Sequence, residues 1–405
     1  MQVIPPAAAL VREIRMKKTA AMFFLILLTV STYGSVRAGD TITGSELIAD
    51  TQASVRPGFW MSQKIDAQFI GMSIGDVDND GKNEIVIIDM SNIMIYRKEG
   101  NFLKLLQKIP GESHEQYLSV DVADIKGDGA KQIIVTSLFR NFPDSFVLEY
   151  KDGKYVKIAS HLRWFLRVIE IGGKHVLLGQ EMGINNPFEN PIYEIVWKNG
   201  SCQQGQRMKI PQGLFVYGLA IAPLEKNGPD MIMALDSYDY LRVYGETDRS
   251  IDRVDALGGS RAAIWKSHEI FGGSNNYFDR TMPQLSPTNP EDRDKMPYVN
   301  LRIINRGIGK DGRAELIIAK NFSQERRWFE NLRIFTSSEV YYMEWDGLGF
   351  TEKWRTRKIQ GYVADYQIKD IDNDGKPEIV TALVTSSYLA WRPVSVVVAY
   401  TMEDK

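Results

Sequence analysis

Three aspartates at alternate positions, Asp76, Asp78 and Asp80, are followed closely by Gly81 and Glu84. Carboxylates this close together repel one another unless a cation neutralises them. Ligands that are all oxygen favour a hard cation, and calcium is the usual one in proteins. Gly81 allows the sharp backbone reversal that turns the carboxylates toward a common centre. The segment therefore predicts a calcium-binding loop.

A second segment repeats this pattern almost without change. Its predicted ligands are Asp370, Asp372, Asp374, Glu378 and the main-chain carbonyl of Lys376, just as Lys82 offers its carbonyl in the first loop. The helix-loop-helix calcium hand places its closing glutamate at position 12, whereas Glu84 is the ninth residue of its loop and the flanking residues are strand-like. The alternative is a solvated acidic turn, because Asp-Gly turns are common.

Two degenerate copies of the loop lie between the complete ones. One begins at Asp124 and the other at Gly307. Lys126 in the first copy, and Gly307 and Gly309 in the second, stand where the complete loops carry side-chain ligands. Too few carboxylates remain for a calcium shell. We expect these turns to keep their shape without metal.

The acidic loops belong to a longer repeat. Trp60 precedes Asp76 by the same number of residues as Trp354 precedes Asp370, and both segments continue into a short apolar run. Later in each unit an alternating segment ends in Tyr or Trp and meets a Gly turn, as after Tyr150, which signals a hairpin. Recurrent units of four short strands are typical of propeller blades.

We therefore predict an all-β fold, a β-propeller of six four-stranded blades. The blades begin near Phe69, Tyr117, Trp164, Val216, Tyr298 and Val363. A seventh blade stays open as an alternative, because residues 246–297 leave room for a degenerate one. A lone strand expected at 59–65 aligns with the fourth-strand segment at 354–359, so it should complete the C-terminal blade. Such closure removes free sheet edges.

The acidic loops between strands make the chain resemble the FG-GAP and VCBS repeats of the integrin α-subunit head and of many exported bacterial proteins. The exported bacterial branch is the better comparison. The resemblance implies a β-propeller with calcium held between the first and second strands of a blade. It covers most of residues 58–405 at the level of blades, and it transfers calcium ligands to the two complete loops alone.

The N-terminal segment has the layout of a secretory signal peptide. Met16 and two lysines precede an apolar run at 20–30, and small residues follow at 36–38. This run is shorter than the ~20 residues of a membrane span, although an uncleaved anchor is the alternative. We predict an extension with signal peptide at 1–38, a linker at 39–57 and the propeller at 58–405. A bacterial Sec-type signal implies a periplasmic or secreted protein with no membrane span after cleavage.

The composition argues against some partners and offers little for catalysis. Lys plus Arg number 49 and Asp plus Glu 51, so the net charge of −2 argues against nucleic acid or an anionic membrane surface as partner. The single cysteine, Cys202, cannot form an internal disulfide. The four histidines do not stand at metal-ligand spacing, and no HExxH, Gly-x-Ser-x-Gly or phosphate loop occurs.

A ligand-binding face is predicted opposite the calcium loops. In a propeller the loops joining strands 2 to 3 and 4 to 1 share one side, and loops on a rigid scaffold commonly bind ligands. The candidate residues are Phe139, Arg140, Phe142, Phe188, Arg326, Arg327, Trp328, Tyr388, Trp391 and Arg392. Arg and aromatic side chains suit a protein or glycan ligand. Their alternative role is to cap the blade cores.

These observations predict an exported calcium-binding propeller that acts as a non-catalytic binding or scaffold module for a protein or glycan. One alternative is a carbohydrate-active enzyme, a glycosidase or polysaccharide lyase, because its acid pair needs no proximity in sequence. Another is a structural subunit of an envelope assembly.

Overall fold

The computed structural model describes residues 41–42, 54–56, 58–184, 186–211, 213–245, 263–278, 297–323, 333–385 and 393–402. Residues Ile42–Lys405 form one compact unit, and the other unit is Met1–Thr41. The predicted signal segment 1–38 lies outside the described residues, as does most of the predicted linker at 39–57. None of the described segments forms a helix of the length and apolarity that crossing a membrane requires.

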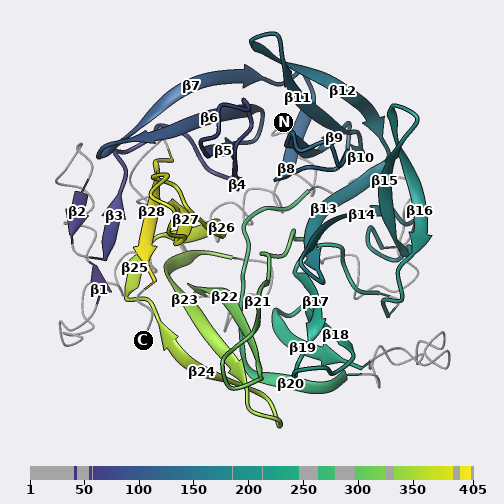
Figure 1. Cartoon of the computed structure of the whole chain (residues 1–405), viewed down its shortest axis with the longest axis vertical. Coiled ribbons are helices and arrows are strands. Elements are labelled where there is room, and N and C mark those ends of the chain that lie inside the picture. The colour runs from purple at the N-terminus through teal and green to yellow at the C-terminus, as the bar shows by residue number, and fades with distance from the viewer. Residues whose placement is uncertain are drawn as a thin grey trace, which may run out of the picture. The chain divides into compact units, whose positions relative to one another are not determined.

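Six antiparallel sheets follow one another around a ring, and we number them blade 1 to blade 6 in chain order (Figure 1). Blade 1 contains β4 (Gly71–Gly75), β5 (Glu84–Ile88), β6 (Asn92–Glu99) and β7 (Phe102–Pro110). Blade 2 contains β8 (Glu115–Ala123), β9 (Gln132–Phe139), β11 (Ser145–Lys151) and β12 (Lys154–Leu162), with the short β10 (Phe142–Pro143) beside β9. Blade 3 contains β13 (Trp164–Ile171), β14 (Lys174–Glu181), β15 (Ile192–Lys198) and β16 (Ser201–Arg207).

The second half of the ring repeats this order. Blade 4 contains β17 (Leu219–Pro223), β18 (Asp230–Leu235), β19 (Tyr240–Tyr244) and β20 (Ala263–Ile270). Blade 5 contains β21 (Ile304–Ile308), β22 (Ala314–Ser323), β23 (Phe335–Trp345) and β24 (Phe350–Arg355), and β25 (Lys358–Gln360) also pairs with β23. Blade 6 contains β26 (Tyr362–Lys369), β27 (Glu378–Val384), β28 (Ser395–Thr401), β3 (Phe59–Met61) and β2 (Ser54–Arg56). The short β1 (Thr41–Ile42) precedes them all in the chain. The prediction of six blades is confirmed.

The N-terminal strand closes the ring, as predicted. β3 pairs antiparallel with β28, so that Met61, Trp60 and Phe59 lie opposite Val398, Ala399 and Tyr400. Figure 1 shows β3 beside β28 although the two strands come from opposite ends of the chain. The pairing covers the edge of β28, which would otherwise be unpaired.

Burial along a blade follows the place of each strand in the ring. All five residues of the second strand β5 are buried, because both of its faces pack on neighbouring blades. The outermost strand β7 is largely exposed and buries few of its side chains. The apolar runs that follow each acidic turn are therefore the cores of the blades. The turns between the first and second strands of the blades therefore lie on one face of the ring.

Candidate metal centre and ligand face

The complete loop of blade 1 connects β4 to β5 and is shaped by its own carboxylates. Asp76 accepts hydrogen bonds from the backbone N–H groups of Asp80 at 3.2 Å and Gly81 at 3.0 Å. Glu84 accepts the N–H of Val77 at 2.9 Å. The backbone takes left-handed conformations at Asn79, with φ 61°, and at Gly81, with φ 86°. Asparagine and glycine tolerate this region best, which is why the sequence carries them here.

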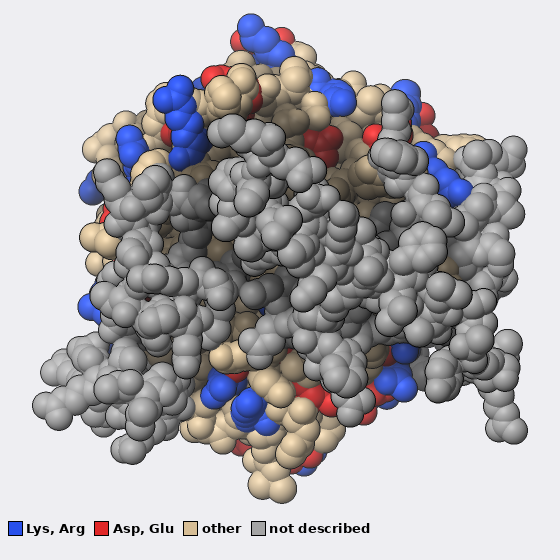
Figure 2. Space-filling model, turned by 180° about the vertical axis from the view of Figure 1, so that it is seen from behind, with Lys and Arg blue, Asp and Glu red and all other residues tan. Residues whose placement is uncertain are grey.

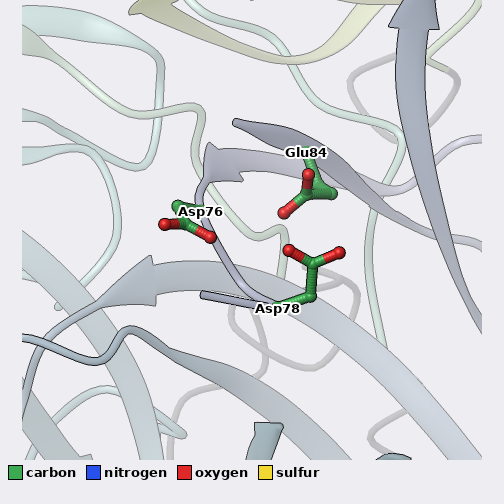
Figure 3. A group of neighbouring side chains, drawn as sticks. All are labelled: Asp76, Asp78 and Glu84. Atoms are coloured by element: carbon green, nitrogen blue, oxygen red, sulfur yellow. The ribbon is translucent and has the colours of Figure 1, made fainter. Parts of the chain in front are cut away.

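This shape brings carboxylates together from separate places in the loop. Oxygen atoms of Asp76, Asp78 and Glu84 lie within 4.8 Å of one another. Figure 3 shows Glu84 on the strand and Asp78 on the loop with their carboxylates directed toward each other. Burial, and next the charge of Asp80, raise the pKa of Asp78. Burial is also the main cause that raises the pKa of Glu84.

The same loop already contains a cation from the chain. Arg97, on β6, pairs through Nη2 with Asp78 at 3.0 Å and through Nη1 with Asp80 at 2.8 Å. Its Nε donates to Glu84 Oε1 at 2.8 Å, and its Nη2 donates to the same oxygen. Desolvation opposes the charged guanidinium, but Glu84, Asp78 and Asp80 together raise the pKa of Arg97. Arg97 was not singled out from the sequence.

The complete loop of blade 6 connects β26 to β27 and has the same backbone geometry. Asp370 accepts the N–H groups of Asp374 at 3.2 Å and Gly375 at 2.8 Å, and Glu378 accepts the N–H of Ile371 at 3.1 Å. Oxygen atoms of Asp370, Asp372 and Asp374 lie within 4.8 Å of one another. Each complete loop therefore brings together three of its four predicted carboxylates, without Asp80 in blade 1 and without Glu378 in blade 6, and metal binding by these groups and by the carbonyls of Lys82 and Lys376 stays a prediction.

The carboxylates of blade 6 are only partly neutralised. Within the described parts of the chain, the one lysine or arginine nitrogen within 4.0 Å of any of them is Lys98 Nζ, which lies 3.3 Å from Asp372. Burial comes first, and the charges of Asp372, Asp370 and Asp374 add to it, in raising the pKa of Glu378 to about 7. A hard cation with oxygen ligands would relieve this repulsion, so the donor set fits calcium.

The two complete loops touch each other where blade 6 meets blade 1. The backbone N–H of Asn83 donates to Asn373 Oδ1 at 2.7 Å, and the side-chain amide of Asn83 donates to the carbonyl of Asp370 at 2.9 Å. Lys98 of blade 1 reaches Asp372 of blade 6. The acidic loops therefore lie at the junction that also closes the ring.

The degenerate loop of blade 2 keeps the fold of the turn, as predicted. In blade 2, Asp124 accepts the N–H groups of Asp128 at 3.3 Å and Gly129 at 2.7 Å, and Gln132 accepts the N–H of Ile125 at 3.0 Å. These are the bonds that Asp76 and Glu84 make in blade 1. Glutamine replaces the closing glutamate without loss of its backbone contact.

The predicted ligand face is described only in part. Arg326, Arg327, Trp328, Tyr388, Trp391 and Arg392 lie outside the described residues. Phe139 ends β9, Phe142 begins β10 and Arg140 lies in the turn between them. The guanidinium of Arg140 lies 5.2 Å from the centre of the Phe139 ring, and Phe142 is 45% exposed. Arg140 and Asn141 both have positive φ values in this turn.

The prediction that Phe188 contributes to this face is wrong. Its side chain is 1% exposed and packs among other aromatic rings in the core. Ring centroids lie 5.1 Å away at Phe165 and 4.3 Å away at Phe215. A polar loop sequence surrounds Phe188, and the ring anchors that loop to the core, as aromatic side chains often do.

A pocket of about 550 Å³ opens on the side of the ring where strands 2 to 3 and 4 to 1 are joined. It lies between blades 1, 2 and 6 and the linker after β20. The lining residues are Gln68, Phe69, Ile70, Asp89, Met90, Ser91, Asn92, Gln116, Ser274, Asn275, Asn276, Tyr277, Tyr362 and Ala364. The sequence predicted this side of the ring, but none of these lining residues is among its named candidates, because they come from five separate segments of the chain.

Ion pairs close the centre of the ring. Arg302, just before β21, donates from Nε to Asp365 Oδ1 at 2.6 Å and from Nη1 to Asp121 Oδ1 at 3.2 Å. Its Nη2 also donates to the carbonyl of Met72 at 3.1 Å. Arg167 lies 3.4 Å from Asp121 on the other side. These groups belong to blades 1, 2, 3 and 6 and to the segment that leads into blade 5, so they join the ring across its axis.

Comparison with known proteins supports the architecture. Residues 76–135, from the acidic loop of blade 1 into β9 of blade 2, match the family model described as an FG-GAP-like repeat. No curated protein matches the chain. The matched segment contains one complete and one degenerate loop, each between the first and second strands of a blade. The closed ring of six four-stranded sheets makes the chain a six-bladed β-propeller, and the match supports its similarity to the FG-GAP and VCBS repeat propellers.

Proposed function

We propose that this chain is an exported propeller, stabilised by calcium, that binds a partner protein through the pocket on its 2-to-3 and 4-to-1 side. The fold of this family supports a binding or scaffold module in general. The observation that carries the proposal is the pocket of about 550 Å³, which lies on the side opposite the acidic loops. The metal and the partner would then bind on opposite faces of the ring.

The chemistry of the pocket wall favours an uncharged polar segment of a protein. Among the described residues of the lining, Asp89 is the only charged one, and its carboxylate accepts the N–H groups of Ser91 at 2.8 Å and Asn92 at 2.7 Å. Two apolar or aromatic side chains remain accessible, because Met90 is 60% and Tyr277 is 44% exposed. Methionine and tyrosine are enriched at protein interfaces.

The distribution of surface charge does not favour a polyanion, such as a nucleic acid, as the partner. In Figure 2, the view from behind, blue basic and red acidic side chains lie beside one another on the described surface. Nucleic-acid binding needs a continuous basic surface, since phosphate neutralisation supplies most of its affinity.

The carbohydrate-active alternative needs a pair of carboxylates about 5 to 10 Å apart. Within the part of the lining that the structure describes, Asp89 is the sole carboxylate, and its oxygens are engaged by the turn at Ser91 and Asn92. A saccharide could still bind the amides and tyrosines of the wall without being cleaved. We therefore expect the chain to bind its ligand, whether a protein or a saccharide, without catalysing a reaction.

Removal of calcium is expected to lower the melting temperature of the chain by several degrees. An ion that binds the native state at a concentration 100-fold above its Kd stabilises it by about 2.7 kcal/mol. Scanning calorimetry in calcium and in chelator measures this shift. Asp76→Asn combined with Asp370→Asn should abolish it, whereas Glu352→Gln, an exposed acid on β24, should leave it intact. Equal melting of the unmodified chain in both buffers contradicts the calcium proposal.

Substitution of Met90 by arginine is expected to weaken partner binding at least tenfold. The new side chain fills the pocket mouth and introduces an unpaired charge against the partner, which costs more than loss of an ordinary contact. Leu348→Arg is the matched control, because Leu348 is 87% exposed in the turn between β23 and β24 on the opposite side.

The measurement is cross-linking and affinity capture from an envelope extract, followed by titration with the captured protein. Loss with Met90→Arg and retention with Leu348→Arg are the expected results. If both variants bind as the unmodified chain does, the pocket is not the site. If Met90→Arg weakens binding of the chain to a glycan array while binding to no protein is affected, the ligand is a saccharide.

A further inference from the structure

The two complete acidic loops have nearly the same sequence and differ in how their charge is balanced. In blade 1, Arg97 contacts Asp78, Asp80 and Glu84, and its side chain is 15% exposed. In blade 6, no lysine or arginine of the described residues lies within 4.0 Å of Asp370, Asp374 or Glu378. Among the described residues a basic partner is found for Asp372 alone, and that lysine belongs to the neighbouring blade.

The difference arises from one position on the third strand. Ile85 pairs with Tyr96, which places Arg97 opposite Glu84. Glu378 pairs with Thr401 at the corresponding position of blade 6. Residues directly opposite on antiparallel strands direct their side chains to the same face. An arginine at 401 would therefore face the blade 6 loop as Arg97 faces the loop of blade 1.

The degenerate loops follow the same rule with cations from other positions. In blade 2 the cation comes from the loop itself, since Lys126 Nζ lies 2.6 Å from both Asp128 and Glu149. In blade 5 it comes from the fourth strand, where Lys353 Nζ lies 2.7 Å from Glu344 and 3.7 Å from Asp311. Three of the four acidic turns thus contain a basic side chain from their own blade.

A guanidinium and a calcium ion compete for the same oxygens. The planar donors of arginine match carboxylates at several oxygens at once, and the charge-assisted bonds are strong. Arg97 uses oxygens of Asp78, Asp80 and Glu84, which are three of the four side-chain ligands predicted for blade 1. A calcium ion in this loop would have to displace the guanidinium and leave it without its partners.

We infer that Arg97 is the resident cation of the blade 1 loop and excludes calcium from it, so that the chain binds one calcium ion, in the blade 6 loop. The inference rests on the proposed calcium binding and decides which of the two loops is responsible. The blade 1 loop then keeps all the residue types of a calcium site but does not bind calcium.

Isothermal titration of the purified chain with calcium, after treatment with chelator, tests the inference by stoichiometry. The unmodified chain should bind one ion. Arg97→Gln should bind two, and its melting temperature in chelator should fall because three carboxylates lose their partner. Thr401→Arg, at an exposed position, should bind none and should melt at the same temperature with and without calcium. The combined variant should bind one ion, now sensitive to Asp76→Asn rather than to Asp370→Asn.

Lys104→Gln, at an exposed residue on the same hairpin as Arg97, is the control and should keep one ion. Two ions in the unmodified chain overturn the inference and leave the calcium proposal standing. If the unmodified chain binds no ion and Arg97→Gln binds one, the proposal that the native chain binds calcium is wrong. Exclusion of calcium from the blade 1 loop by Arg97 is then still supported. One ion retained by Thr401→Arg, or no gain in folded Arg97→Gln, overturns the inference.

Discussion

Replacement of Arg302 by methionine is expected to lower the free energy of unfolding by about 3 to 5 kcal/mol, because a buried ion pair that loses one partner leaves an uncompensated charge. Asp365 is 3% and Asp121 is 3% exposed, so water cannot replace the guanidinium. Arg302 also holds the carbonyl of Met72. Urea denaturation followed by tryptophan fluorescence measures the change.

Two further variants separate charge from packing. Arg357→Met, at an exposed arginine, should change the free energy of unfolding by less than about 0.5 kcal/mol. Arg302→Met combined with Asp365→Leu should recover part of the loss, because removal of both partners costs less than removal of one. If Arg302→Met behaves like Arg357→Met, the axial network does not stabilise the ring.

The network around Arg302 also makes part of the stability of the propeller sensitive to acid. Burial opposes ionisation of Asp365, but Arg302 outweighs it and lowers the pKa of this carboxyl. A carboxyl whose pKa is lower in the folded state contributes stability above its unfolded pKa and loses that contribution as the pH falls through its folded pKa. Arg302→Met should therefore weaken this part of the acid dependence as well as the stability at neutral pH.

Deletion of the closing strand is expected to abolish cooperative folding. Trp60 is 7% and Met61 is 6% exposed, and burial of each such side chain contributes about 1.5 to 3 kcal/mol. Ser62 and Ile65 add backbone hydrogen bonds to Val397 and Ser395, each of 2.9 Å. The total loss is on the order of 5 to 10 kcal/mol, which is comparable to the whole stability of a typical domain.

A matched pair of truncations tests the closing strand. Removal of residues 1–57 keeps β3 and should preserve a sharp thermal transition, whereas removal of residues 1–66 should eliminate it. A peptide of residues 58–66 added to the shorter chain should restore the transition, since it can pair again with β28. Equal melting of both truncated chains contradicts the role of β3 as the closing strand.

The architecture was predictable because its signals are local and repeated. Each blade carries its own turn, apolar run and hairpin, so six weak copies reinforce one another. Ring closure followed from the alignment of the segment around Trp60 with that around Trp354. The error at Phe188 has a related cause, since residue type alone cannot tell an aromatic anchor in the core from one at the surface.

The sequence alone determined the β-propeller, the number of blades, the closing strand and the carboxylates that each loop gathers, because residues a few positions apart specify turns and strand periods. The tertiary structure alone decided how those charges are balanced. Whether an acidic loop meets Arg97 or Thr401 depends on strand register, and the partners of Arg302 come from blades far apart in the chain. Electrostatic energies depend on distances and burial in space, which spacing along the chain does not encode.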